Sequence, residues 1–160
     1  MAVRVQREDF DVGAELAALT AGRTDIGGVS CFLGLVRDIA GERPITAMTL
    51  EHYAGMTEKM LGEIETEARR RWPLDATLIV HRHGRLEPGD RIVLVITASA
   101  HRKAAIESCE FLIDWLKTKA PFWKLEETDA GARWVAARQS DDAAAARWKE
   151  PRQTAGKAAK

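Results

Sequence analysis

The stretch RIVLVITASAHRK, Arg91 to Lys103, decides the fold because two secondary structures meet inside it. Its first nine residues, RIVLVITAS, are rich in β-branched side chains and predict a strand. A long helix from about Lys103 to Lys119 follows. Its apolar positions recur at helical spacing and predict one buried stripe. That stripe consists of Ala105, Cys109, Leu112 and Leu116, widened by Ile106 and Ile113.

The junction between this strand and this helix reads SAHR, Ser99 to Arg102. Backbone N–H groups converge at the start of a helix, and His101 and Arg102 add further donors, so the junction suits an anion. The alternative is purely structural. Ser99 or a neighbour would then cap the first turn of the helix.

Patterns on both sides extend this layout into a mixed α+β fold. Residues 29–36, VSCFLGLV, are nearly all apolar and predict a strand covered on both faces, with a bulge at Gly34. Asp11 caps a short helix, and Ala120 before Pro121 ends the long one. Further strands are expected at 45–53, 77–81 and 132–137, and further helices at 56–71 and 141–148.

The composition fits one domain over residues 1–150 and a disordered tail over 151–160. Twenty-four basic residues balance 24 acidic ones, so no global field favours nucleic acid or an anionic membrane. No apolar run approaches the ~20 residues that span a bilayer. Cys31 and Cys109 sit in apolar segments and are expected to be buried, reduced thiols, which indicates a cytoplasmic protein.

The segment LKTKAPFWKLEE surrounds a proline and two aromatic residues with lysines. An Asp114–Lys117 pair would account for one lysine as an ordinary helix-surface charge, worth about 0.2–0.5 kcal/mol. Burial beside Phe122 and Trp123 would instead make a lysine amine a useful base or nucleophile. Residues alone leave both interpretations open.

Other candidate chemistry is weaker. Arg37 follows the apolar strand, and an ion pair with Asp38 or Glu42 would explain it without a ligand. His81 and His83 could share one strand face, but no carboxylate or cysteine completes a ligand pattern, so we predict no metal. No phosphate loop and no GxSxG motif is present, and we predict no cofactor.

Several motifs, in order, resemble the large, catalytic subunit of molybdopterin synthase, the MoaE family. They span about residues 27 to 148, most of the chain. The pairing of SAHR with LKTKAPFWK is specific. The matching stretches are GLVRD, TLEHYAGMTEKML, EARRRWPL, HRHGRLEPGD, SAHR, IDWLKTKAPFWKLE and RWVAARQSD.

The resemblance implies a sulfurtransferase that converts cyclic pyranopterin monophosphate to molybdopterin. The two dithiolene sulfurs would come from the Gly-Gly thiocarboxylate of a small ubiquitin-like subunit. Two large subunits would form a central homodimer within a 2:2 heterotetramer. The implied fold is an α/β hammerhead-like mixed sheet with packed helices and an added antiparallel subdomain.

The resemblance also implies site residues. Lys117 and Lys124 match the catalytic lysines, and His101 and Arg102 would reach the site from the neighbouring large subunit. The chain departs from some relatives at Leu35 and Leu125, where a basic residue also occurs. The full set of expected substrate contacts is Leu35, Val36, Arg37, His101, Arg102, Lys117, Lys124, Leu125, Glu126 and Arg138.

Two other functions compete with the sulfurtransferase. One is a non-catalytic scaffold that binds the small sulfur-carrier protein, although the presence of both Lys117 and Lys124 disfavours it. The other is an unrelated enzyme with a Schiff-base lysine. We also expect residues 151–160 to be dispensable for turnover.

Overall fold

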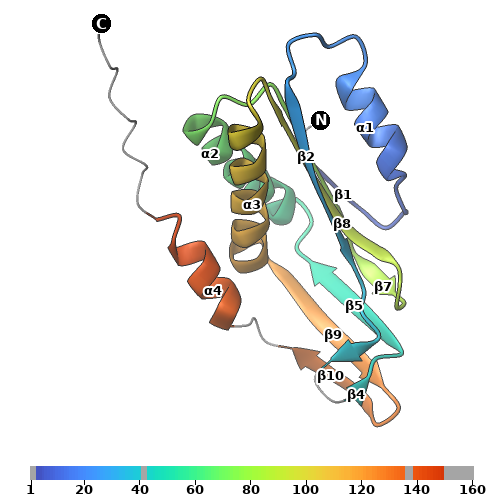
Figure 1. The fold of residues 1–160 in the computed structure, drawn as a ribbon. Helices are drawn as coiled ribbons and strands as arrows, with labels where there is room; N and C mark the ends of the chain where they lie inside the picture. The colour runs from blue at the N-terminus through green and yellow to red at the C-terminus, as the bar shows by residue number, and fades with distance from the viewer. Residues whose placement is uncertain (1–2, 41–42, 136–138, 150–160) are drawn as a thin grey trace, which may run out of the picture.

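The computed structural model describes residues 3–40, 43–135 and 139–149, which form two sheets and their covering helices (Figure 1). The helices are α1 Val12–Thr20, α2 Met56–Arg71, α3 Arg102–Lys119 and α4 Gln139–Ala146. The strands are β1 Val3–Gln6, β2 Gly28–Leu35, β3 Ile39–Ala40, β4 Arg43–Pro44, β5 Ala47–His52, β6 Ala76–Arg82, β7 Gly84–Leu86, β8 Arg91–Ser99, β9 Phe122–Thr128 and β10 Gly131–Val135. The expected α+β class is confirmed.

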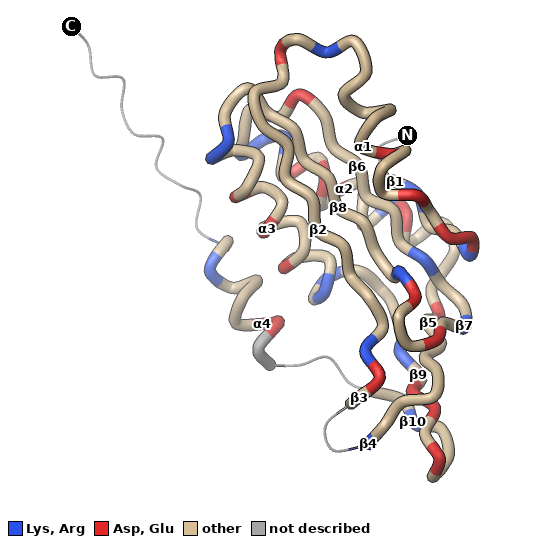
Figure 2. The backbone as a smooth tube through the Cα atoms, turned by 45° about the vertical axis from the view of Figure 1, so that its right-hand side comes forward, with Lys and Arg blue, Asp and Glu red and all other residues tan. Residues whose placement is uncertain are grey.

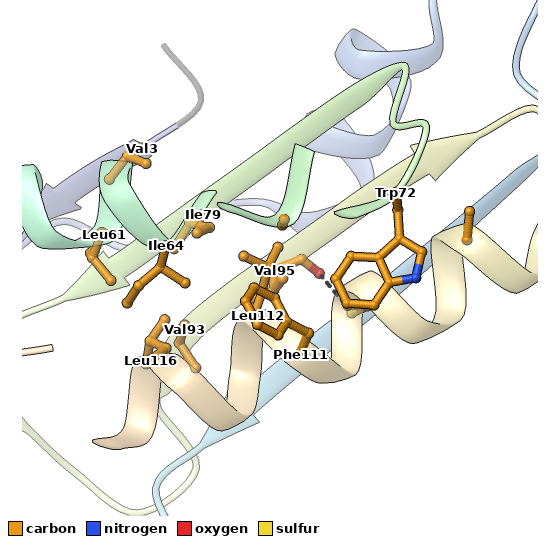
Figure 3. Close-up of a cluster of buried hydrophobic side chains, with 13 residues drawn as sticks. Val3, Leu61, Ile64, Trp72, Ile79, Val93, Val95, Phe111, Leu112 and Leu116 are labelled. Atoms are coloured by element: carbon orange, nitrogen blue, oxygen red, sulfur yellow. Dashed lines mark hydrogen bonds between the residues drawn. The ribbon is translucent and has the colours of Figure 1, made fainter. Parts of the chain in front are cut away.

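The first sheet has the order β1-β6-β8-β2 and carries the main core. Strands β1 and β6 run parallel, and the other neighbours run antiparallel. Helices α2 and α3 cover one face. Figure 3 shows Leu61, Ile79, Val95, Phe111 and Leu112 from these helices and strands pointing toward one another. Helix α1 covers part of the other face through a second apolar cluster.

The second sheet has the order β10-β9-β5-β7 and is antiparallel throughout. It corresponds to the added antiparallel subdomain that the family resemblance implied. Val36 lies just past β2 and packs in a small buried cluster with Met48, Leu50 and Leu86 of this sheet. The end of β2 is therefore held against the second sheet.

Several local signals act as expected. Asp11 accepts a hydrogen bond from the Ala14 backbone at 2.7 Å and caps α1. Helix α3 ends at Lys119 because Ala120, before Pro121, is extended with ψ 131°. The pairing of β2 with β8 shifts register between Gly34 and Leu35, which confirms the bulge.

Strand β2 corrects two expectations. Its exposure alternates along the strand, so only one face is covered, whereas the sequence predicted cover on both faces. Helix α3 packs on one side, but α1 does not extend over the other side of β2. Cys31 is exposed rather than buried for this reason, while Cys109 is buried as expected. Ile106 is also 57% exposed and lies outside the core stripe.

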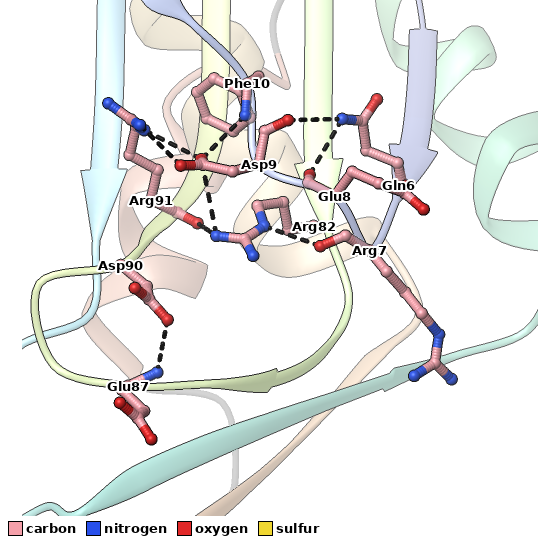
Figure 4. Close-up of polar contacts among 9 residues, drawn as sticks. All are labelled: Gln6, Arg7, Glu8, Asp9, Phe10, Arg82, Glu87, Asp90 and Arg91. Atoms are coloured by element: carbon pink, nitrogen blue, oxygen red, sulfur yellow. Dashed lines mark hydrogen bonds and ion pairs between the residues drawn. The ribbon is translucent and has the colours of Figure 1, made fainter.

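Polar contacts fix the chain where β1 leads into α1 (Figure 4). Arg91 donates to both carboxylate oxygens of Asp9, at 3.0 and 2.6 Å. These bonds hold the pKa of Asp9 at about 2, below its ordinary 3.8. Arg82 donates to the Arg7 carbonyl at 3.0 Å and closes the cluster. The contacts join the α1 entry to β6 and β8.

Lysine and arginine residues are interspersed with aspartate and glutamate residues over the backbone (Figure 2), and the 24 basic residues balance the 24 acidic ones in number. None of the helices in the described part of the chain is long and apolar enough to cross a membrane. The expected tail at 151–160 lies outside the described residues.

Candidate functional site

The ends of β2 and α3 meet at one end of the first sheet. Strand β8 runs antiparallel to β2, and α3 turns back from β8 and packs on both strands. Helix α3 therefore runs in the direction of β2, so Arg37 and Lys117 lie toward the same end of the molecule, as the two elements show in Figure 1. Strand β9 starts there and brings Lys124. Topology thus gathers three of the sequence-predicted cations near the second sheet.

Lys117 lies in the last turn of α3 and is exposed. The Asp114–Lys117 pair, one of the two interpretations that the sequence left open, is not among the ion pairs of the described residues, because Asp114 binds other groups. Its Oδ2 atom accepts hydrogen bonds from Arg147 at 2.8 Å and from the Trp148 indole at 2.7 Å. Both donors come from just after α4. No ion pair of Lys117 occurs among the described residues, so its ammonium is available to a ligand.

Lys124 is held by a buried carboxylate on its own strand. Its Nζ atom lies 3.1 Å from Oε1 of Glu126, whose side chain is only 3% exposed. The other oxygen, Oε2, has no hydrogen-bond partner among the described atoms, and Arg133 of β10 stays 3.8 Å away. Two residues apart on a strand, Lys124 and Glu126 share one face. The family resemblance implies a substrate contact for Glu126, which stays a prediction; in this structure the side chain contacts Lys124.

The residues at the end of β2 differ in what they offer. Leu35 and Arg37 are exposed, and no ion pair of Arg37 occurs in the described part of the chain. The Val36 side chain is 5% exposed, and its backbone pairs with Gly89 and Asp90. A contact from Val36 to a ligand would therefore require its neighbours to move. Arg37 is the group that this segment presents.

His101 and Arg102 lie at the opposite end of α3. His101 is the N-cap residue but makes no side-chain cap bond, and both residues are exposed. Ser99 is not the N-cap residue of α3. Its hydroxyl donates a hydrogen bond to the Pro73 carbonyl and accepts one from the backbone N–H of His101. At 1.5 Å per residue, Arg102 and Lys117 are about 22 Å apart along the helix. One chain therefore does not bring the two groups together.

The aromatic residues beside the lysines pack differently from the expectation. Phe122 stacks on His81 with ring centroids 3.9 Å apart, and Trp123 packs edge-on against Tyr53 at 4.6 Å. Neither arrangement buries Lys117. Burial instead acts on the histidine, and it lowers the pKa of His81 from 6.5 to about 4.

Further residues complete the picture. Leu125 follows Lys124 and so projects from the opposite face of β9. Arg138 and Glu42 lie outside the described residues. Sequence reasoning missed Arg133 and His52. The pairing of β10 with β9 puts Arg133 opposite Glu126, and the pairing of β5 with β9 puts His52 opposite Phe122. Both pairs depend on the register of β9 with its two neighbours, which the sequence analysis did not predict.

Together these features define the class of protein to which the chain belongs. The chain is an α+β protein that gathers exposed or partly exposed lysine and arginine side chains where two sheets meet, a geometry suited to anionic ligands. No cluster of three or more possible metal ligands occurs in residues 3–40, 43–135 and 139–149.

The family follows from comparison with known proteins. The model of the MoaE protein family matches residues 5–119, and the chain belongs to that family. It is 57% identical over 150 residues to the molybdopterin synthase catalytic subunit of Pseudomonas aeruginosa, covering 94% of this chain and all of that one. It is 52% identical to the subunit of the same name from Escherichia coli, covering 88% and 93%. The chain is thus an enzyme of molybdenum cofactor biosynthesis.

Solved structures support the same family. A MoaE protein from Burkholderia ambifaria superimposes with a TM-score of 0.79 at 56% identity, covering 92% of this chain and 98% of that one. Molybdopterin synthase from Staphylococcus aureus gives 0.79 at 30% identity, covering 85% and 98%. The expected hammerhead-like fold with an added sheet agrees with these neighbours.

Proposed function

We propose that this enzyme converts cyclic pyranopterin monophosphate to molybdopterin by inserting two sulfurs. The sulfurs would come from the thiocarboxylated C-terminus of a small ubiquitin-like subunit. The observation that carries the proposal is the grouping of Arg37, Lys117 and Lys124 at one end of a MoaE-family fold. Substrate phosphate, donor thiocarboxylate and product carboxylate are all anions that such cations stabilise.

The two lysines differ in their surroundings, and this difference suggests different roles. Lys124 is fixed as an ion pair by buried Glu126, so its ammonium suits the positioning of an anionic group. Lys117 is exposed and has no ion-pair partner in the described part of the chain. It is therefore free to meet the incoming carrier tail. There it can transfer protons as sulfur adds to the pterin and water leaves, or form a covalent adduct with the tail.

The partner is a small sulfur-carrier subunit. A solved structure is described as the complex of subunits 1 and 2 of the molybdopterin-converting factor from Helicobacter pylori. It superimposes with a TM-score of 0.72 at 20% identity, which shows the shared fold. Exposed Tyr53, Trp123 and Trp134 lie on or beside the second sheet, and aromatic side chains of this kind are frequent in protein interfaces.

A homodimer of this chain inside a 2:2 assembly would complete the site. His101 and Arg102 lie about 22 Å from Lys117 along α3, too far to share one small ligand within a chain. A second copy can supply them. We also place the enzyme in the cytoplasm, since Cys31 and Cys109 are both unpaired.

The deciding experiment is single-turnover conversion of cyclic pyranopterin monophosphate with thiocarboxylated carrier, comparing the wild type with Lys117→Ala. We expect conversion by the wild type and a loss of at least about a hundredfold in the variant. Carrier affinity, measured by calorimetry, should change far less. Lys119→Ala is the matched control, because this neighbouring lysine lies over the Trp115 ring at 4.2 Å instead of facing the site.

The conversion assay and a separate trapping experiment distinguish the sulfurtransferase from the two alternative functions. A wild type that binds carrier but converts nothing, unaffected by Lys117→Ala, would identify a binding scaffold. Borohydride trapping of a carbonyl substrate on Lys117 would support a Schiff-base enzyme.

A further inference from the structure

Helix α4 and the residues that follow it pack against α3, toward the end of α3 that carries Lys117 (Figure 1). Trp148 packs on the main core, where its ring centroid lies 5.7 Å from that of Phe111 and 5.6 Å from that of Trp72. Arg71 of α2 donates a hydrogen bond to the Trp148 carbonyl. The segment after α4 is thus anchored to both long helices.

This anchored segment binds two carboxylates on the polar side of α3. The Nη2 atom of Arg147 lies 2.6 Å from Oε1 of Glu110 and 2.8 Å from Oδ2 of Asp114. The indole N–H of Trp148 donates to the same Asp114 oxygen at 2.7 Å. Hydrogen bonds to Glu110 and Asp114 raise the pKa of Arg147 above its ordinary value, so the guanidinium is a permanent positive charge. Two donors, one of them cationic, therefore converge on Asp114.

Asp114 is also the acid best placed to capture Lys117. Residues three apart on a helix are surface neighbours, with Cβ atoms about 5–6 Å apart. Asp114 is the only acid within four residues of Lys117 in the sequence. Its side chain is 15% exposed, so water and salt screen its charge less than that of a fully exposed acid. Without its partners from the α4 segment, Asp114 would pair with Lys117 and add negative charge beside a site for anions.

We infer that Arg147 and Trp148 are positioning residues, which occupy Asp114 and so keep the Lys117 ammonium free for the anionic carrier tail and substrate. The inference accounts for a lysine that has no ion pair in the described part of the chain although an acid lies one helical turn away. It rests on the proposed function and adds to the reaction two residues that act through Asp114.

Substitution of the cation tests the first step. Arg147→Ala removes the charge that balances Asp114 but leaves the Trp148 side chain unchanged. We expect single-turnover conversion with thiocarboxylated carrier to fall by about fivefold, the size of a favourable ion pair near the surface. Arg147→Lys retains the positive charge and should recover most of this loss. A full-rate Arg147→Ala enzyme would overturn the inference.

A second substitution separates positioning from stabilisation of the fold. Adding Asp114→Asn to Arg147→Ala removes the charge that would capture Lys117, while the amide oxygen can still accept from the Trp148 indole. We expect the double variant to return to within about twofold of the wild type. A contact that only holds α4 in place predicts the opposite, because a further weakened contact loosens the helix more. A double variant no faster than Arg147→Ala would contradict the positioning role.

Glu110→Gln is the matched control. This change also removes an ion pair of Arg147, but it leaves both donors on Asp114. Its rate should stay within about twofold of the wild type. If Glu110→Gln lost as much activity as Arg147→Ala, the attachment of α4 would govern the rate, and the inference would be wrong.

Labelling of Lys117 tests the same interaction without the reaction. Acetic anhydride modifies neutral amines, and an ammonium paired with a carboxylate releases its proton less readily. Lys119 is the internal reference, because it lies over the Trp115 ring at 4.2 Å and is five residues from Asp114. Peptide mass spectrometry should show the Lys117 to Lys119 labelling ratio falling at least twofold in Arg147→Ala and returning in the double variant. An unchanged ratio in Arg147→Ala would overturn the inference.

The two measurements distinguish failure of this inference from failure of the proposed function. A wild type that converts no pterin would contradict the proposed function, and the labelling ratio would still decide whether Asp114 captures Lys117. An active wild type with an unaffected Arg147→Ala variant would contradict the inference alone.

Discussion

Glu126 is the residue whose surroundings say most about the chemistry. Burying a carboxylate is costly unless it is paired. Here one oxygen faces Lys124 and the other has no hydrogen-bond partner among the described atoms. We interpret this carboxylate as a positioning group that holds the Lys124 ammonium in place. A ligand contact by Glu126 itself remains a prediction of the family resemblance.

Glu126→Gln should therefore lower kcat/KM by about tenfold, since the amide keeps the shape but loosens the lysine. Steady-state kinetics with thiocarboxylated carrier would measure the loss. Arg133→Gln is the control, because Arg133 is 3.8 Å from Glu126 and 65% exposed. It should stay within about twofold of the wild type. Equal losses in both variants would show that the whole hairpin, and not the Lys124 contact, matters.

At the scale of elements, the course of β2 depends on Gly34. A Cβ at this position would come 2.7 Å from Cγ1 of Val93 on the neighbouring strand, which is closer than side chains pack. The β-bulge lies between Gly34 and Leu35, immediately after this position, and it redirects the chain toward Arg37. Glycine is thus required by close approach to β8.

Gly34→Ala should reduce the free energy of unfolding by about 1–3 kcal/mol through overpacking. Gly62→Ala offers an internal comparison, because no other atom lies within 4 Å of the Cβ that would be added at this position of α2. It should raise the free energy of unfolding by up to about 1 kcal/mol through helix propensity. Urea denaturation of both variants tests the pair. A Gly34→Ala protein as stable as wild type would show that Val93 moves aside freely.

At the scale of the whole molecule, histidines lie where the two sheets meet. His81 of β6 stacks on Phe122 of β9, and the His83 ring lies 4.2 Å from that of His52 in β5. Burial lowers the pKa of His81 to about 4, and burial also lowers the pKa of His83. The native state therefore holds His81 neutral at pH values where the unfolded chain binds a proton.

The sign of the pH dependence follows from this difference. The stabilising contribution of neutral His81 is complete above pH 6.5 and is lost as the pH falls toward 4, by about 3 kcal/mol in all. His81→Gln should flatten the fall in unfolding free energy between pH 6.5 and 4.5. Asp9→Asn should change the profile only below about pH 4, where Asp9 starts to be protonated in the unfolded chain. An unchanged slope in His81→Gln would show that other groups titrate in this range.

The sequence by itself determined the helices α2 and α3, their ends, the strand β8 and the bulge at Gly34. These features depend on local patterns: apolar spacing, a proline after Ala120, and a glycine inside an apolar run. It also pointed to Lys117, Lys124 and Arg37 through the family motifs.

Tertiary structure alone decided the rest. An apolar run does not reveal which face stays open, so β2 was expected to be covered on both sides and Cys31 to be buried. Nor does a helix-like lysine spacing reveal that Asp114 binds Arg147 and Trp148. Strand β9 was missed because Phe122 to Thr128 gains its structure from pairing with β5 and β10. The pairing with β5 joins residues far apart in the chain, and local sequence patterns do not encode it.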